Sequence, residues 1–518
     1  MKSHYYITTA IPYANDKPHL GHAIEFLYTD VMARFQKMLG NEVYFLSGTD
    51  EHGQKMLKTA KDAGKPVEEF AAEKSAIFQN LLDQWNISND DFIRTTEERH
   101  IKGAQKIWKS VFDNGDIYKK SYTGLYCYGC ESFKTEKDLV DGKCPLHNRA
   151  PDTVSEENYF FKLSNYAEPL KFLFEKQKDF VIPENRGKEM LNIINDGLED
   201  VSISRSKEKL PWGILVPGDE TQVMYVWFDA LSNYITALGY GSDQKLLKKF
   251  WPGVHVIGKD INRFHSLLWP AMLMSAGLDV PRQIAVHGFI YAADGQKMSK
   301  TLGNVVDPME LTNEFPLEAV RYYLMREIPF DNDGNFSTKQ LALRYQSDLA
   351  NGIGNLCNRI LTMIEMYSDN QVPKVENVNQ DFINFLQKST WPIYEKNMNL
   401  WRFDLALEAT WKFVTFCDQQ ISDRQPWAMA KAGKTEEVHD LLYHLAEALR
   451  HIAVMVWPVM PETAEKIITQ LGFDFSEKFA KPLSELQQWV DLTVGNKINK
   501  GLPLFPRLEK NNICHTSI

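Results

Sequence analysis

Two short motifs contain the residues of this chain that are best suited to chemistry on a phosphate. The tetrapeptide His19–His22 reads His-Leu-Gly-His, and Lys297–Lys300 reads Lys-Met-Ser-Lys. Two histidines at this spacing can face one ligand from the start of a helix, and a helix N-terminus favours phosphate. Two lysines in a glycine-flanked loop could close over a triphosphate and neutralise the charge on its leaving group. Each tetrapeptide also has an ordinary alternative: a chance sequence or helix cap for the first, and a solvated basic loop for the second.

Two glycines and an aspartate add to this nucleotide-binding pattern. Gly21 lies between the histidines and has no Cβ, so a base or ribose could approach the backbone there. Gly258 and Asp260 follow the strand-like run Val254–Ile257, and an aspartate in that position suits a ribose hydroxyl. Gly258 and Asp260 could also belong to an ordinary turn.

Three cysteines and a histidine have the spacing of a zinc site. Cys127 and Cys130 form a Cys-x-x-Cys pair, and Cys144 and His147 form a Cys-x-x-His pair further along the chain. Because both halves have ligand spacing, the pattern indicates a Cys₃His site. Four protein ligands leave no open position, so the zinc would be structural. The alternative is a set of cysteines that bind no metal.

Composition restricts the classes of protein to which the chain could belong. It has 518 residues and 44% hydrophobic content, enough for several domains, and its six cysteines indicate a reducing compartment, hence the cytoplasm. The N-terminal residues form no export signal, and the apolar run at 452–460 is too short to span a bilayer. A net charge of −10 counts against nonspecific nucleic-acid binding but not against recognition of a folded RNA.

The elements that must position these residues begin as an α/β pattern. Runs rich in β-forming residues at 5–11 and 42–47 flank a stretch of helical spacing at 23–39. This arrangement predicts a βαβ unit, hence a parallel sheet with ligands at the carboxyl ends of its strands. Further strand-like runs that would complete this sheet lie at 222–228, 254–258 and 283–288.

From 341 to 500 the pattern is almost entirely helical, with apolar anchors every three or four residues, which predicts a helix bundle. The predicted fold is α/β: a split Rossmann-type parallel sheet with a zinc-bearing insertion, followed by an all-α bundle. The expected divisions of the chain are 1–116 and 216–290 for the two halves of the sheet domain, 117–215 for the insertion, 291–340 for the lysine-loop region and 341–518 for the bundle.

Longer motifs around these residues resemble one enzyme family. Ile-Pro-Tyr-Ala-Asn at 11–15, Gly-Thr-Asp-Glu-His-Gly at 48–53 and Tyr-Val-Trp-Phe-Asp-Ala at 225–230 are similar to segments of methionyl-tRNA synthetases, which are class I aminoacyl-tRNA synthetases. The resemblance includes both tetrapeptides and extends to about Pro506. The further matching segments are 258–261, 264–265, 286–288, 355–359 and 425–427.

The resemblance implies a two-step reaction. Methionine would attack the α-phosphate of ATP, which Mg²⁺ accompanies, to give methionyl-adenylate and pyrophosphate. The methionyl group would then pass to the terminal adenosine of tRNA(Met), for initiation and elongation of translation. The residues implied to bind ATP are His19, Gly21, His22, Gly258, Asp260, Lys297 and Lys300, and the two histidines and two lysines among them would be catalytic.

The resemblance also implies a methionine pocket. Aromatic walls suit a polarizable thioether, and Asp50 would accept hydrogen bonds from the α-ammonium group. Tyr234 and His265 could offer hydrogen bonds near the sulfur, whereas spacing alone would assign Trp227 and Ile261 to the core. The residues that resemble the family's pocket are Ile11, Tyr13, Asp50, Trp227, Ala230, Tyr234, Ile261 and His265.

Three residues of the predicted bundle resemble the family's anticodon-binding positions. Asn355 and Arg359 lie four residues apart and would share a helix face, and Trp427 could stack on an unpaired base. Core packing is the ordinary alternative for Trp427. In the family, the insertion packs over the active site, and some members lack its cysteines, so zinc is not required by the chemistry.

Other enzymes share parts of the pattern. Leucine, isoleucine and valine enzymes carry a much larger editing insertion, the cysteine enzyme holds zinc in its catalytic sheet, and small nucleotidylyltransferases have no helix bundle. A non-catalytic RNA-binding relative is disfavoured because both histidines and both lysines are intact. Many bacterial members add a C-terminal β-barrel that dimerises them, and this chain has no room for it, so a monomer is expected. No binding to a membrane is expected either, because the apolar run at 452–460 is too short to span one.

Overall fold

The computed structural model describes residues 3–127, 132–134, 136–145, 148–296, 298, 304–489 and 491–507. The chain forms two compact units. The sheet unit comprises His4–Thr29 and Val43–His287, and the helical unit comprises Met1–Ser3, Asp30–Glu42 and Gly288–Ile518. Helix α1 (Leu20–Met38) contributes residues to both units.

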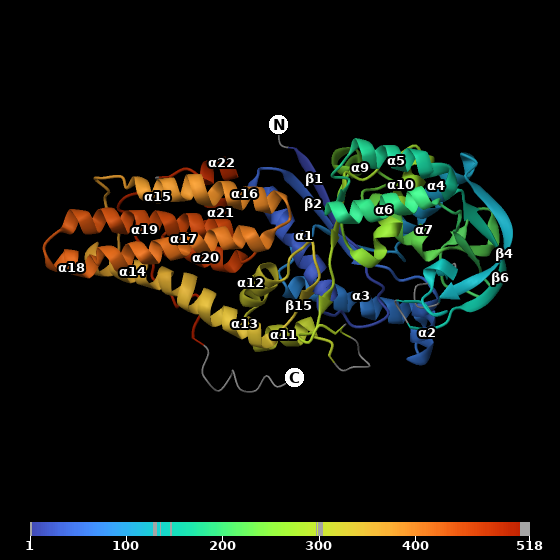
Figure 1. Cartoon of the computed structure of the whole chain (residues 1–518), viewed down its shortest axis with the longest axis horizontal. Coiled ribbons are helices and arrows are strands. Elements are labelled where there is room, and N and C mark those ends of the chain that lie inside the picture. The colour runs from blue at the N-terminus through green and yellow to red at the C-terminus, as the bar shows by residue number, and fades with distance from the viewer. Residues whose placement is uncertain are drawn as a thin grey trace. The chain divides into compact units, whose positions relative to one another are not determined.

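A six-stranded sheet forms the centre of the sheet unit (Figure 1). Four of its strand pairs, β2–β3, β1–β12, β12–β13 and β13–β7, are parallel. The strand order reverses at β1, so the crevice that binds ligands in such sheets is expected at the carboxyl ends of β1 and β12. The order is β3 (Asp91–Arg94), β2 (Glu42–Thr49), β1 (His4–Thr9), β12 (Val254–Gly258), β13 (Gln283–His287) and β7 (Val181–Ile182).

Helix α1 connects β1 to β2, as the helical spacing at 23–39 predicted. Ile24, Leu27, Val31 and Phe35 recur at helical spacing and are all buried, which explains why the segment folds as a helix against the core. The strands predicted at 5–11, 42–47, 254–258 and 283–288 are confirmed as β1, β2, β12 and β13. The further α-helices described in this unit include α2 (Gln54–Asp62), α3 (Val67–Gln84), α4 (Glu98–Asp113), α5 (Ala167–Lys176), α6 (Glu184–Asp196), α8 (Asn233–Thr236), α9 (Lys245–Phe250) and α10 (Trp269–Ser275).

The segment predicted as an insertion contains an antiparallel sheet of order β5-β4-β6-β8. Its two long strands, β4 (Ile117–Cys127) and β6 (Asp152–Phe161), pair along almost their whole length. The short strands are β5 (Ser132–Lys134) and β8 (Val201–Ser202). Strand β7 lies in the same segment but joins the parallel sheet beside β13.

The prediction of a single strand at 222–228 within the parallel sheet is wrong. Strand β11 (Asp219–Met224) belongs to a separate antiparallel sheet of order β10-β11-β9, and helix α7 (Val226–Leu231) follows it at once. Tyr225 between them has extended backbone angles and ends the strand. The run is rich in β-branched and aromatic residues because both elements are buried, and burial overrides the strand propensity of the helical half. The partners of β11 are β9 (Ser204–Ser206) and β10 (Leu215–Val216).

The helical unit confirms the predicted bundle. Helix α19 (Thr435–Val456) is its most buried element, with every residue from 441 to 456 buried. The other helices are α11 (Pro308–Glu314), α12 (Leu317–Glu327), α13 (Thr338–Arg344), α14 (Gly354–Tyr367), α15 (Gln380–Asn384), α16 (Trp391–Asn399), α17 (Phe403–Arg424), α18 (Pro426–Lys431), α20 (Pro461–Gln470), α21 (Phe475–Phe479) and α22 (Leu483–Leu486). Two short strands, β14 (Ile290–Tyr291) and β15 (Gly334–Asn335), also pair in this unit.

The bundle's helices end earlier than the predicted residue 500. Beyond α22 the described residues up to 507 form no helix. The backbone there bonds to another segment instead: Gly495 N–H donates to the carbonyl of Val372, and Ile498 N–H to that of Asn370. Backbone groups satisfied in this way cannot also form helical bonds.

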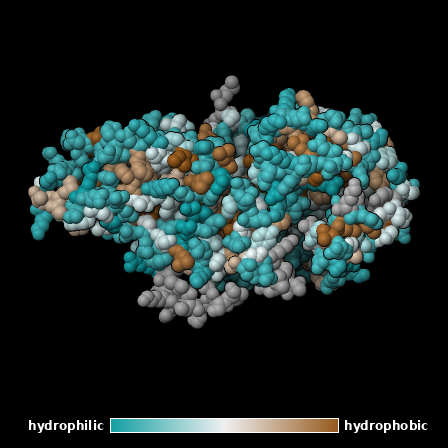
Figure 2. Space-filling model, in the orientation of Figure 1, coloured by the Kyte–Doolittle hydropathy of each residue, from teal (hydrophilic) through white to brown (hydrophobic). Residues whose placement is uncertain are grey.

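Hydrophilic residues cover most of the face drawn in Figure 2, and hydrophobic residues form small separate patches on it. Within the described part of the chain, no helix is long and apolar enough to cross a membrane.

Candidate active site

The two histidines of the first tetrapeptide lie at the start of α1 with their rings stacked. The ring centroids of His19 and His22 are 3.8 Å apart, and the interplanar angle is 15°. The backbone N–H of His19 donates to Nδ1 of His22 over 3.2 Å, which leaves the proton of His22 on Nε2. Burial, together with the neighbouring His19, lowers the pKa of His22 well below its usual value. His22 therefore offers a neutral N–H donor at neutral pH.

Gly21 lies directly under the ring of His19. A Cβ at this position would lie 2.9 Å from Cε1 of His19, closer than real Cβ contacts allow. The observed position of the His19 ring therefore requires a glycine here. This is a second reason for the glycine, beside the approach of a ligand to the backbone.

Glu25, one turn further along α1, connects the carboxyl ends of two strands. Its carboxylate accepts from the backbone N–H of Ala10 over 2.8 Å and lies 3.0 Å from Nε2 of His287. Burial raises the pKa of Glu25, and the contacts with His287 and Ala10 oppose that rise. Glu25 was not predicted from the sequence, although its position three residues after His22 places it on the same helix face.

Gly258 and Asp260 lie at the end of β12, between β1 and β13 in the sheet. Gly258 is buried and Asp260 is exposed. A Cβ on Gly258 would lie 2.9 Å from Oδ1 of Asp260 and 3.8 Å from the His287 ring. Asp260 also acts electrostatically on Glu25. The predicted nucleoside residues and the end of β13 therefore meet at one point of the sheet.

Asp50 directly follows β2, and hydrogen bonds fix its backbone. Its N–H donates to the carbonyl of Pro12 over 2.9 Å, and its carbonyl accepts from Ala14 N–H over 3.0 Å. Tyr13 pairs with Asp50 as an isolated parallel bridge. Two residues of the predicted methionine pocket are thus held side by side, and the side chain of Asp50 is buried.

The neighbouring Glu51 holds this loop in place through hydrogen bonds of its carboxylate and its carbonyl. Its buried carboxylate accepts two hydrogen bonds from the Arg94 guanidinium, at 2.6 and 3.0 Å, and one from Thr96 at 2.6 Å. The indole N–H of Trp212 donates to the Glu51 carbonyl over 2.5 Å. Sequence reasoning missed these supporting residues because nothing in their spacing connects them.

An aromatic group surrounds the start of α7. Trp227 stacks on Phe264 with a centroid separation of 4.0 Å and an interplanar angle of 6°. Its ring also meets His265 edge-on at 6.1 Å. Ala230 is buried almost one turn after Trp227 on α7. The indole N–H of Trp227 is buried and has no hydrogen-bond partner among the described residues.

Tyr234 and His265 form a neutral hydrogen-bonded pair beside Trp227. Nδ1 of His265 lies 3.1 Å from the carbonyl of Ile261, an acceptor, so this nitrogen carries the proton. Nε2 then accepts from the Tyr234 hydroxyl over 2.7 Å. Burial lowers the pKa of His265 to about 4 and raises that of Tyr234 well above its usual value, so neither is charged at neutral pH.

The remaining predicted pocket residues lie in the same unit. Ile11 and Ile261 are partly buried and pack against the core of the sheet unit, as do Trp227 and Phe264. The predicted methionine residues therefore all lie in the sheet unit. Some follow strands β1, β2 and β12, and the others lie on α7 or in the helical segment Asn233–Thr236 after it.

The two lysines and half of the zinc pattern cannot be placed. Lys297, Lys300, Cys130 and His147 lie outside the described residues. Cys127 at the end of β4 and Cys144 are both buried. The described residues alone contain no group of three or more metal-binding side chains.

The chain around Cys144 is a tight turn. Asn148 N–H donates to the Cys144 carbonyl over 2.8 Å, and Cys144 N–H to the carbonyl of Arg149 over 2.9 Å. Asn148 itself has a positive φ of 48°. A buried thiol in a turn of this kind fits a metal-binding knuckle.

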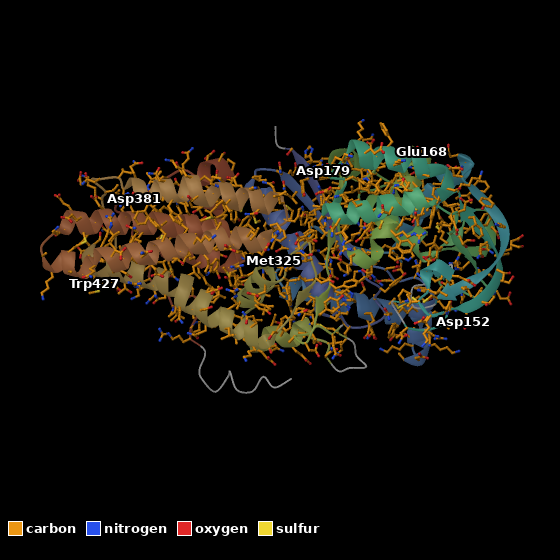
Figure 3. The ribbon with its side chains drawn as sticks, viewed as in Figure 1. Asp152, Glu168, Asp179, Met325, Asp381 and Trp427 are labelled. Carbon is orange, nitrogen blue, oxygen red and sulfur yellow. The ribbon has the colours of Figure 1, made fainter. Side chains whose placement is uncertain are left out.

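Two of the predicted anticodon residues lie on α14 of the helical unit. Asn355 and Arg359 are partly buried, and the Arg359 guanidinium lies 2.7 Å from the Asp418 carboxylate of α17. Trp427, at the start of α18, is 49% exposed. Figure 3 labels Trp427 beside the end of the bundle where α17 and α18 meet. This exposure excludes the alternative of core packing for Trp427.

Comparisons with known proteins agree with this architecture. A model of the family described as "tRNA synthetases class I (M)" matches residues 5–153 and 134–361. A methionine–tRNA ligase of Caldanaerobacter subterraneus is 44% identical over 98% of this chain and 80% of its own length. One of Rhizobium meliloti is 43% identical over 98% of both chains.

A solved structure is similar over the whole fold. Mycobacterium tuberculosis methionyl-tRNA synthetase in complex with methionyl-adenylate superposes with a TM-score of 0.93 at 38% identity, covering 98% of this chain and 100% of that one. The apo form from the same organism gives a TM-score of 0.87 at 35% identity. With the family model and these identities taken together, the chain belongs to the methionyl-tRNA synthetases of class I.

Proposed function

We propose that this chain is a methionine–tRNA ligase that activates methionine with ATP and transfers it to tRNA(Met). In the first step a carboxylate oxygen of methionine forms a bond to the α-phosphorus of ATP, and the bond to the bridging oxygen breaks, releasing pyrophosphate. In the second step a hydroxyl of the terminal tRNA ribose attacks the methionyl carbonyl, and AMP leaves. Both steps require positioned charge and donors more than covalent catalysis by side chains.

The neutral Tyr234–His265 pair beside Trp227 is the observation that carries the amino-acid assignment. A thioether is apolar, polarizable and a weak acceptor, so it suits aromatic walls and a hydroxyl without a nearby charge. Asp50, fixed beside Tyr13, supplies the carboxylate that an α-ammonium group needs. We assign Ile11, Ala230 and Ile261 to the same pocket.

The nucleotide is assigned to the carboxyl ends of β1 and β12. His22 offers a neutral Nε2–H to a phosphate oxygen, and His19 stacks against it at the positive end of α1. Gly258 and Asp260 are assigned to the ribose side. Lys297 and Lys300 are proposed to neutralise the leaving pyrophosphate, and Mg²⁺ would supply further charge neutralisation when bound with ATP.

We propose that zinc is held by Cys127, Cys130, Cys144 and His147. The support is the double ligand spacing together with the burial of Cys127 and Cys144 and the turn at Cys144. Four protein ligands would fill the coordination shell, so zinc would stabilise the insertion and take no part in adenylation.

Metal analysis tests the zinc proposal. Purified protein is expected to contain about one zinc per chain, as a closed four-ligand site requires, and Cys144→Ser should reduce that content. Cys417→Ser is the control, because Cys417 is buried in the bundle far from any proposed ligand in sequence. Equal zinc in both variants would contradict the proposal.

Binding of the tRNA is assigned to the helical unit. Asn355, Arg359 and the exposed Trp427 offer hydrogen bonds and a stacking surface suited to unpaired bases. A cytoplasmic location follows from this role, because translation consumes charged tRNA there. A monomer remains a prediction.

Charging of tRNA tests the function directly. With ATP and labelled methionine, the protein is expected to form an acid-precipitable, base-labile methionyl ester on initiator and elongator tRNA(Met). A leucine tRNA transcript is the control and should stay uncharged. Methionyl-adenylate formed without any charging of tRNA(Met) would contradict the second step.

A further inference from the structure

A buried carboxylate with two histidine partners lies behind the proposed methionine pocket. Oδ2 of Asp229 is 2.7 Å from Nδ1 of His52, and Oδ1 is 2.7 Å from Nε2 of His100. All three side chains are buried.

The protons of this group can be assigned from its geometry. Burial alone would raise the pKa of Asp229, but the charges and hydrogen bonds of His52 and His100 outweigh it, and the pKa is lowered. An ionised carboxylate only accepts, so each histidine donates to it: His52 from Nδ1 and His100 from Nε2. Nδ1 of His100 in turn lies 2.9 Å from the hydroxyl of Thr236.

Asp229 lies on a different face of α7 from the residues assigned to methionine. Along an α-helix, residues three apart share a face and residues two apart do not. Trp227 and Ala230 therefore lie on one side of α7, the side assigned to methionine, and Asp229 lies on the other. Two hydrogen bonds to imidazoles that belong to other elements hold Asp229, so a small rotation of α7 would break them.

His52 carries the second link, to the loop that presents Asp50. The backbone N–H of His52 lies 3.4 Å from Oδ1 of Asp50. Its ring meets Trp212 edge-on at 5.3 Å, and the carbonyl of Trp212 accepts from Gly53 N–H. His52 is thus fixed in backbone and side chain, and Asp229 is joined to the same loop that carries the proposed ammonium acceptor.

We propose that Asp229 is a positioning residue for methionine, which fixes Trp227 and Ala230 on α7 relative to Asp50 through its hydrogen bonds to His52 and His100. This inference rests on the proposed function. A purely structural role for the same group would affect folding stability and leave substrate affinity unchanged, so the two readings are separable.

The test is Asp229→Asn in methionine-dependent ATP–pyrophosphate exchange, with KM measured separately for methionine and for ATP. An amide keeps the size of the side chain but cannot accept from both histidines. KM for methionine is expected to rise about tenfold or more, which is the change that loss of one hydrogen bond to a buried charge produces. KM for ATP should stay within about twofold, since none of the described residues assigned to ATP hydrogen-bonds to Asp229.

Asp116→Asn is the matched control. Asp116 is also a buried carboxylate of the sheet unit with a lowered pKa, and it accepts from Tyr166 at 2.6 Å and Ser275 at 2.7 Å. It contacts no residue of the proposed pocket. Its amide variant should lower the thermal midpoint, as Asp229→Asn does, with no change in KM for methionine.

A pair of substitutions at His52 keeps the test independent of Asp229. His52→Asn places an amide N–H where Nδ1 was and should retain most of the affinity for methionine. His52→Ala removes the donor and should raise KM for methionine as Asp229→Asn does. Both substitutions shorten the same side chain. The difference in KM for methionine between the two variants therefore measures the effect of the hydrogen bond to Asp229.

Three outcomes would overturn the inference in folded protein: an unchanged KM for methionine in Asp229→Asn, a parallel rise of both KM values, or the same rise in Asp116→Asn. Failure of the proposed function has a different signature, because the wild-type protein would then show no methionine-dependent exchange at all.

Discussion

The tautomer of a single histidine decides what the proposed pocket can offer a thioether. His265 uses Nδ1–H for the carbonyl of Ile261 and Nε2 as the acceptor for Tyr234. The Tyr234 hydroxyl is therefore committed as a donor to the histidine, and its oxygen remains able to accept or to contact sulfur. The pair provides polarity without charge, which suits methionine better than it suits a charged or strongly polar amino acid.

Removing that hydroxyl should weaken methionine binding. In Tyr234→Phe the buried Nε2 of His265 loses the donor that it has among the described residues, and an unsatisfied buried acceptor costs about 1–3 kcal/mol. KM for methionine in exchange is expected to rise about tenfold, with KM for ATP unchanged.

Tyr394→Phe is the control for that substitution. Tyr394 is a buried tyrosine of the helical unit whose hydroxyl donates to the carbonyl of Met455 over 2.8 Å. It should lose comparable stability but keep its KM for methionine. If Tyr234→Phe binds methionine as the wild type does, the assignment of the pocket is contradicted.

The lowered pKa of His265 predicts a dependence of stability on pH. Its pKa is about 4 in the folded state, whereas an unperturbed histidine has a pKa of about 6.5, so between these values the unfolded chain binds more protons. Stability from this group is therefore complete above pH 6.5 and decreases as the pH falls toward 4. At pH 5 the loss is about 2 kcal/mol.

His265→Gln isolates this contribution, because glutamine does not titrate. The free energy of unfolding, measured in urea at pH 7 and pH 5, should fall less for the variant than for the wild type. A buried histidine that does not interact with His265, such as His451, contributes equally to both proteins and cancels in the comparison. An identical pH dependence would show that His265 is not neutral by burial.

Individual site residues were predictable where a local motif carried them. His19, His22 and Asp50 lie in short sequences whose spacing already indicates a function. His52 and Asp229 also lie in such motifs, but their pairing with each other and with His100 could not be predicted, because the two histidines are 177 and 129 residues away from Asp229 in the sequence. Each is an ordinary buried polar residue until its partners are known.

Helix α1 links the nucleotide site to the sheet by its own geometry. Its first turn presents His19 and His22, and Glu25 one turn later joins the ends of β1 and β13. The helical spacing of its apolar residues made the element predictable. The stacking of the two histidine rings over Gly21 was not, because it depends on side-chain packing.

Gly21→Ala should damage catalysis without damaging the fold. The new Cβ would meet the His19 ring at 2.9 Å and displace it, and a misplacement of this kind can reduce a rate about a hundredfold. Alanine is otherwise favourable in a helix. The exchange rate should therefore fall while the thermal midpoint stays within about 2 °C of the wild type.

Gly187→Ala in α6 provides the comparison. A Cβ there would meet its nearest atom, the Val181 carbonyl oxygen, at 3.4 Å, which is an ordinary contact. This variant should exchange at the wild-type rate. Full activity of Gly21→Ala would contradict the role assigned to the His19 ring.

The error at 222–228 has a physical cause at the level of elements. Apolar and polar residues alternate too little along this run to distinguish a buried strand from a buried helix. Its aromatic and β-branched residues favour a strand. The chain instead ends β11 at Met224 and begins α7 at Val226. This short helix carries Trp227 and Ala230, which we assign to the methionine pocket, so strand propensity concealed an element of the proposed site.

In the whole molecule, the two compact units are assigned different tasks. The residues proposed for methionine and the nucleoside belong to the sheet unit, and those proposed for the anticodon belong to the helical unit. A net charge of −10 fits recognition of tRNA through a few specific contacts more than through general attraction to phosphate. Activation and tRNA recognition should therefore be separable by mutation.

Trp427→Ala should show that separation. Stacking of a base on an aromatic side chain is worth about 1–3 kcal/mol, so kcat/KM for tRNA(Met) should fall about tenfold or more. ATP–pyrophosphate exchange, which needs no tRNA, should be unchanged.

Ile393→Ala is the matched change, because Ile393 on α16 is another exposed apolar residue of the bundle, with 44% of its surface accessible. It should charge tRNA normally. Equal charging by the two variants would exclude Trp427 from the tRNA contact.

The central claim is that this chain forms methionyl-adenylate at the ends of β1 and β12, and amino-acid-dependent ATP–pyrophosphate exchange tests it most directly. The twenty amino acids would be compared one at a time, with wild-type protein and with Lys300→Ala. We expect exchange with methionine alone, and a strong reduction in the variant. Exchange with leucine, valine or cysteine in place of methionine, or no exchange by folded protein with any amino acid, would contradict the account.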